Sequence, residues 1–168
     1  MNRFFGKLAK AAMIAAVLCL VAGGALANDR PRPYRQRSEG MMVGPCVLAG
    51  LPGNLWAETG NATHAGLFES LTCVIVTGGA FPVYTIAGEG WSTEANGDRG
   101  HYFLGGTVNV AEDPCVSEYT TRVVGGISHK GVPVNVTGEF QSISIVPWSA
   151  PGICGPEQTT TASGTITY

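Results

Sequence analysis

From residue 41 onward, the hydrophobic and polar positions are patterned for strands rather than helices. Runs of β-branched and aromatic residues are bounded by glycine, proline and other turn-forming residues, and no segment keeps a 3.6-residue apolar period. The runs predict strands over Val43–Ala49, Leu55–Glu58, Ala62–Phe68, Ser70–Thr77, Val83–Glu94, Arg99–Val110, Val116–Val124, Val132–Val146 and Thr159–Tyr168. About eight consecutive antiparallel strands with short turns indicate one all-β domain, a small eight-stranded up-and-down barrel, with a two-sheet sandwich as the alternative.

The pair Asn96-Gly97 predicts the register of one hairpin. Asn-Gly favours a two-residue type I′ turn, in which both residues take a positive φ. Glu94 would then face Arg99, Trp91 would face Tyr102, and Glu89 would face Leu104. In this register one face of the hairpin is apolar except for Glu89. A slip of one residue would exchange the two faces.

The strand near residue 140 changes its apolar parity. Val136 and Phe140 share one parity, whereas Ile143 and Ile145 share the other. A β-bulge near Gln141-Ser142 is the simplest explanation, and bulges of this kind help a sheet to close into a barrel.

The segment Ser70–Thr77 is apolar on both faces. Leu71, Cys73 and Ile75 alternate with Val74 and Val76, and a strand that is apolar on both faces is buried on both. In a barrel its outer face must therefore be covered. We expect the segment Val43–Ala49 to cover it, with a second subunit of a homo-oligomer as the alternative.

The first 27 residues have the features of a signal peptide. Arg3, Lys7 and Lys10 precede an apolar run over residues 11–22, and Ala25-Leu26-Ala27 fits a cleavage site. The run is shorter than the roughly 20 residues that span a bilayer, so we expect no integral membrane segment after processing. These features predict an exported protein, periplasmic or extracellular, with a signal peptide over 1–27, a basic disordered arm over 28–40 and a barrel domain over 41–168.

Charge is distributed unevenly along the chain. Arginines at 30, 32, 35 and 37 crowd the predicted arm, whereas only Asp29 and Glu39 of the 12 acidic residues precede residue 40. A nucleic-acid-binding domain would carry a basic face on the domain itself, so we predict no nucleic-acid partner. The arm is interpreted as a tether, with electrostatic attachment to an anionic envelope surface as the alternative.

Four cysteines remain after the predicted cleavage: Cys46, Cys73, Cys115 and Cys154. An even number in an exported chain favours two disulfides, and no close-spaced pair supports a metal site. Four cysteines allow three pairings. Because alternate connections of a meander lie at the same end of the sheet, the topology favours Cys115–Cys154, which leaves Cys46–Cys73.

Few residues point to catalysis. The chain has no Gly-x-Ser-x-Gly elbow, no phosphate-binding loop and no Cys-x-x-Cys. His64, His101 and His129 lie far apart in the sequence, and zinc held by all three in a closed barrel is the alternative. We therefore predict no cofactor and no metal, and no catalytic residue is identified beyond one candidate.

That candidate is Glu89. In the predicted register it lies on the apolar face, where desolvation would raise its pKa and suit it to general acid/base chemistry. Trp91, Tyr102 and Leu104 beside it would form the wall of an apolar ligand pocket. The alternatives are a bulge at the flanking glycines that turns Glu89 outward, or an ion pair with Arg122.

Three short pieces of the chain resemble a group of small exported bacterial proteins. These pieces are Ala62–Gly66, Ala95–Asp98 and Gly164–Tyr168, and the likeness extends over most of residues 55–168. The group is Gly/Thr-rich and similar to the allene oxide cyclase and dirigent barrels. The resemblance implies an eight-stranded barrel that can be oligomeric, and it transfers no catalytic residue.

These observations favour a non-catalytic binding protein for a small apolar ligand. A cyclase- or isomerase-like enzyme acting on a hydrophobic substrate is one alternative. A structural surface protein is the other, and a barrel interior filled by its own side chains would favour it.

Overall fold

The computed structural model describes residues 30–129, 132–150 and 153–168. The predicted signal peptide, residues 1–27, lies outside the described residues. None of the helices among the described residues is long and apolar enough to cross a bilayer.

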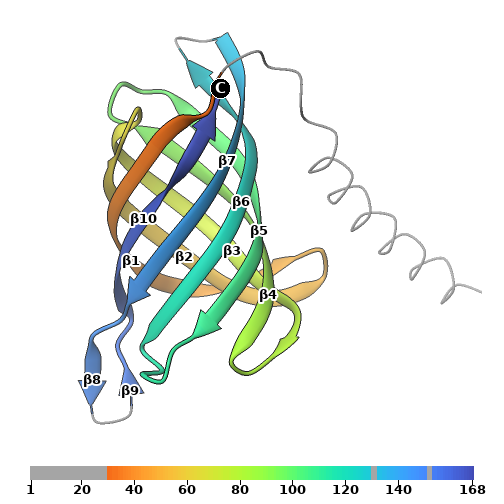
Figure 1. Ribbon diagram of the computed structural model, residues 1–168, viewed down its shortest axis with the longest axis vertical. Helices are drawn as coiled ribbons and strands as arrows, with labels where there is room; N and C mark the ends of the chain where they lie inside the picture. The colour runs from red at the N-terminus through yellow and green to blue at the C-terminus, as the bar shows by residue number, and fades with distance from the viewer. Residues whose placement is uncertain (1–29, 130–131, 151–152) are drawn as a thin grey trace, which may run out of the picture.

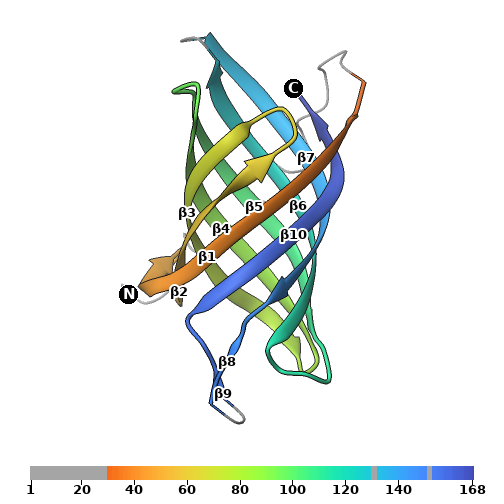
Figure 2. The ribbon, with the colours of Figure 1, turned by 90° about the vertical axis from the view of Figure 1, so that its left-hand side faces the viewer.

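The chain folds into a closed eight-stranded antiparallel barrel (Figure 1). Neighbouring strands follow the order β1-β10-β7-β6-β5-β4-β3-β2, so the chain runs as a meander and its last long strand closes against its first. A two-stranded sheet, β8-β9, projects from the barrel between β7 and β10 (Figures 1 and 2). The strands are β1 Arg32–Leu48, β2 Leu51–Ala62, β3 Gly66–Ala80, β4 Val83–Glu94, β5 Arg99–Val110, β6 Val116–His129, β7 Val132–Ile145, β8 Trp148–Ala150, β9 Ile153–Cys154 and β10 Glu157–Thr167. The barrel predicted from the sequence is confirmed.

Strand β1 corrects the prediction of a disordered arm over residues 28–40. From Arg32 onward this segment is strand, and Arg32–Met41 pairs with β10 while Gln36–Leu48 pairs with β2. Its side chains alternate: Tyr34 and Gln36 face the barrel interior, whereas Arg35 and Arg37 are exposed. The prediction was wrong because the inward residues are themselves polar. The segment therefore lacks the alternation of hydrophobic and polar residues by which a strand is recognised in the sequence.

The predicted strand over residues 62–68 is also wrong, because this segment contains the β2–β3 turn. His64 and Gly66 there have φ values of 75° and 69°. Strand β2 therefore ends at Ala62 and β3 begins at Gly66.

The β4–β5 hairpin has a register one residue away from the predicted one. The Gly97 N–H donates to the Glu94 carbonyl and the Glu94 N–H donates to the Asp98 carbonyl, both at 2.9 Å. Gly97 has a φ of 85°, whereas Asn96 keeps a negative φ. This is a three-residue loop, a type I turn closed by a left-handed glycine, instead of the two-residue type I′ turn. Trp91 consequently pairs with His101 and Glu89 with Phe103.

Strand β7 carries no bulge, so the bulge predicted near Gln141-Ser142 is wrong. Its pairing with β6 and with β10 runs without a register shift up to Ile145. Ser144 is buried in the interior, while Ile143 and Ile145 are exposed on the outside. The change of parity reflects a polar interior, and the shifts in register occur in β1 between Met42 and Gly44 and in β3 between Val76 and Gly78.

Both predicted disulfides, Cys46–Cys73 and Cys115–Cys154, are present. The first joins β1 to β3 across β2 and holds Cys46, in the segment Val43–Ala49, against the outer face of β3. Cys73 and Ile75 on that face are only 7% and 3% exposed. The outer face of β3 is therefore covered within the chain at these residues, and a homo-oligomer stays a prediction. Disulfides of this kind are typical of oxidising compartments.

Candidate functional site

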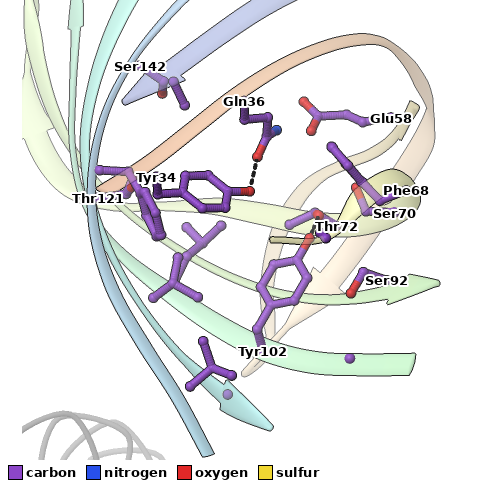
Figure 3. Close-up of a pocket in the computed structure, with 18 of the residues that line it drawn as sticks. Tyr34, Gln36, Glu58, Phe68, Ser70, Thr72, Ser92, Tyr102, Thr121 and Ser142 are labelled. Carbon is purple, nitrogen blue, oxygen red and sulfur yellow. Dashed lines mark hydrogen bonds between the residues drawn. The ribbon is translucent and has the colours of Figure 1, made fainter. Parts of the chain in front are cut away.

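The barrel encloses a cavity of about 290 Å³. Inward-facing side chains from all eight barrel strands line it, and Figure 3 shows part of this lining. Aromatic rings dominate its apolar part: Tyr34, Trp56, Phe68, Tyr102, Tyr119 and Phe140. An apolar wall with a few converging polar groups is the usual character of a small-molecule site.

Glycines make room for the rings at the cavity wall. A Cβ at Gly90 would lie 2.6 Å from Cζ of Tyr102, and a Cβ at Gly138 would lie 2.2 Å from Cζ of Phe140. Each ring therefore lies over a neighbouring glycine of the interior face. This arrangement helps to keep the centre of the barrel unfilled.

The polar groups of the interior are joined by hydrogen bonds. The Tyr34 hydroxyl donates to Oε1 of Gln36 at 2.7 Å, and Nε2 of Gln36 donates to the Ser38 hydroxyl at 3.2 Å. The Tyr102 and Thr72 hydroxyls share a hydrogen bond of 2.6 Å, which Figure 3 also draws. Burial raises the pKa of both tyrosines. Their hydroxyls therefore stay protonated and can donate or accept a hydrogen bond at neutral pH.

Among the carboxyl groups of the cavity wall, Glu58 on β2 has the surroundings best suited to a functional acid. Its side chain points into the interior, and Nε2 of Gln158 on β10 donates to its Oε1 at 3.0 Å. Desolvation by burial raises the pKa of Glu58, and the bond from Gln158 lowers it less. Burial raises the pKa of Tyr119, as it does that of Tyr102, and the charge of Glu58 raises both further, so these groups share one electrostatic environment.

Sequence reasoning missed Glu58, although the criterion used for Glu89 describes it. The criterion is an inward carboxyl among aromatic side chains, and Glu58 has the same parity as Trp56 on β2 and lines the cavity with it. The signal available in the sequence was the shared parity of Trp56 and Glu58. To use it, one must know which face of β2 points inward, and the short predicted segment Leu55–Glu58 did not show this.

The predicted site residues are divided between two faces. Tyr102 and Leu104 line the cavity as predicted, but Glu89 and Trp91 lie on the outside of the barrel. Glu89 contacts His101, with 2.8 Å between Oε1 and Nε2, rather than Arg122. Trp91 is 50% exposed and stacks on the His101 ring at 5.2 Å between centroids. Glu89 faces outward because the register at Gly97 differs by one residue from the predicted one. The pairing of β4 with β5 has no bulge at Gly88 or Gly90.

A second hollow of about 340 Å³ lies at one rim of the barrel. There the Arg32 guanidinium lies 5.8 Å from the centre of the Tyr168 ring, and His64 meets the same ring edge-on at 6.1 Å. His64 is thus a rim residue and His101 an outer-face residue. Within the described part of the chain, no three His, Cys, Asp or Glu side chains are grouped so that they could hold a metal ion.

Comparison with known proteins identifies no relative: no protein-family model, no curated protein and no solved structure matches the chain. The geometry of the cavity is therefore the basis of any functional proposal.

Proposed function

We propose that this protein is an exported barrel that binds a small, largely apolar molecule in its interior cavity. The observation that carries the proposal is an unfilled cavity of about 290 Å³ with a wall of aromatic rings. A dry cavity of about 150 Å³ is large enough for benzene, so the interior offers room for a ring with a short chain. A structural protein has no need of such a space, and a core filled by its own side chains would be more stable.

Export to the periplasm or the medium is part of the proposal. It rests on the two disulfides, which favour an oxidising compartment, and on the signal peptide predicted over 1–27. The resemblance to the allene oxide cyclase and dirigent barrels stays a prediction.

A cyclase- or isomerase-like activity is the second candidate, and Glu58 is the observation in its favour. A carboxyl whose pKa burial raises is suited to move a proton near neutral pH. A carboxyl without a defined substrate position supports binding more directly than catalysis. We therefore give binding precedence, with Glu58 in place of Glu89 as the acid/base of the alternative.

Native mass spectrometry tests the proposal on protein purified from its own host. We expect a small molecule that co-purifies and is released when the protein unfolds. Ser142 lines the cavity and the neighbouring Gln141 is exposed, so Ser142→Phe should fill the cavity and abolish the bound mass. Gln141→Phe is the matched control and should keep it. Bound mass that survives Ser142→Phe in a folded protein would contradict an interior site.

A further inference from the structure

We propose that the ligand of the cavity carries a positive charge, so that the barrel takes a small amine or quaternary ammonium ion with an apolar body. The charged nitrogen would lie against Glu58 and the neighbouring aromatic rings. This inference rests on the proposed function, because it specifies the ligand of the same cavity.

The charges of the cavity wall are the first reason. Glu58 and Glu94 lie on the wall, and no lysine or arginine occurs among the described residues that line this cavity. The His101 ring, which is near this wall, is engaged by Glu89 on the outer side. A carboxylate removed from water is costly unless a counter-charge accompanies it. A ligand ammonium group would supply the cation that the described lining residues of this cavity do not.

The available atom of Glu58 is the second reason. Gln158 occupies Oε1, and none of the described residues donates a hydrogen bond to Oε2. Figure 3 shows the Glu58 carboxyl pointing into the space between the strands, on the side where Gln36 also points inward. Oε2 can therefore accept a hydrogen bond from an N–H of the ligand or contact a quaternary nitrogen electrostatically.

The aromatic rings are the third reason. Tyr34, Trp56, Phe68 and Tyr102 line the same cavity as Glu58. The faces of aromatic rings attract cations, and ring clusters beside a carboxylate recognise substituted ammonium ions. The same surroundings disfavour an anion, since Glu58 would repel it and no lysine or arginine among the described lining residues would compensate.

Three matched probes separate charge from shape: 2-phenylethylamine, 2-phenylethanol and 3-phenylpropionate. They share a phenyl ring on a short chain and differ in the charge at its end. Titration calorimetry on the mature protein at pH 8 should give the amine a dissociation constant at least about tenfold lower than that of the alcohol, with the propionate weakest. Glu58→Gln should weaken the amine to the level of the alcohol and leave the alcohol unchanged. Glu89→Gln, outside the barrel, should change neither.

The pH dependence of the unmodified protein provides a second measurement, which does not depend on a variant that folds. An alkylamine stays protonated up to about pH 9, as lysine does. Protons compete with the amine for Glu58, so amine affinity should rise with pH through the elevated pKa of Glu58 and then level off. Affinity for the alcohol should not follow this rise.

The outcomes distinguish the two proposals. Equal binding of amine and alcohol, with no effect of Glu58→Gln and no pH dependence, would overturn the cationic ligand while the apolar binding site stands. Absence of binding for all three probes, together with no co-purifying molecule, would overturn both.

Discussion

Gly90 shows how a single missing side chain shapes the cavity. A Cβ at this position would lie 2.6 Å from Cζ of Tyr102 and 2.8 Å from Oγ1 of Thr72. We expect Gly90→Ala to displace the Tyr102 ring, break its hydrogen bond to Thr72 and lower the free energy of unfolding by roughly 1–3 kcal/mol. Urea denaturation measures this loss.

Gly105 on the adjacent strand β5 offers the matched control. A Cβ there would meet nothing within 4 Å, so Gly105→Ala should change the free energy of unfolding by no more than about 0.5 kcal/mol. Equal effects of the two substitutions would show that the space over Gly90 is not needed by Tyr102.

Residue-level chemistry was predictable from the sequence, but its location was only partly so. Tyr102 and Leu104 were expected on the inward face and line the cavity, whereas Glu89 was expected there and Glu58 is the carboxyl that lies there. Side chains of a strand alternate between faces, so a one-residue error in one turn reverses the assignment of every residue on one strand. Physical chemistry predicted that an inward carboxyl would lie beside aromatic rings. Which carboxyl this is could be identified only with the correct strand register.

At the scale of elements, the turn at residues 95–97 explains that error. A two-residue and a three-residue loop both place Gly97 at a positive φ, and the sequence pattern is compatible with either. They differ in the conformation of Asn96, which a local motif does not determine. The shifts in β1 and β3 were also hidden, because each occurs beside a glycine, Gly44 or Gly78, that leaves no side-chain pattern to follow.

The disulfide Cys46–Cys73 ties two elements that are not neighbours in the sheet. It closes a loop with a sequence separation of 27 residues, for which chain entropy predicts a stabilisation of roughly 3–4 kcal/mol. We expect Cys46→Ala with Cys73→Ala to lower the free energy of unfolding by about this amount and to expose Ile75. Denaturation in urea and hydrogen exchange at Ile75 measure the two effects.

Removal of Cys115–Cys154 is the comparison for this experiment. Its sequence separation is 39 residues, so the entropic loss should be similar, while hydrogen exchange at Ile75 should stay slow. Rapid exchange at Ile75 in both double variants would mean that global opening, not release of the β1–β2 hairpin, exposes this residue.

At the scale of the whole molecule, the first half of the strand that closes the barrel, β1, was not recognisable from the sequence. Charged, proline-containing segments are commonly disordered, and the charges of Arg35 and Arg37 supported that prediction for residues 28–40. In the barrel these charges are on the outside, and the inner residues Gln36 and Ser38 satisfy one another by a hydrogen bond. The strand count was predictable because the other strands are rich in β-branched residues. The role of β1 was not, since its inner face carries hydrogen-bonding groups in place of apolar ones.

The closure of the barrel predicts the effect of removing residues up to Gly40. Without this part of β1, β10 loses its β1 partner along Gln158–Ile166 and becomes an unpaired edge. The interior also loses Tyr34, whose ring packs on Phe140 at 4.8 Å between centroids. We expect a chain that starts at Met41 to show no cooperative thermal transition by circular dichroism, because the sheet can no longer close.

The double variant Arg35→Gln with Arg37→Gln removes the exposed charges and keeps the strand, so it should unfold cooperatively within about 1 kcal/mol of the unmodified protein. If the shortened chain melted cooperatively and the charge variant did not, the segment would stabilise the protein through its charges, and the hydrogen-bonded closure between β1 and β10 would not be what holds the barrel together.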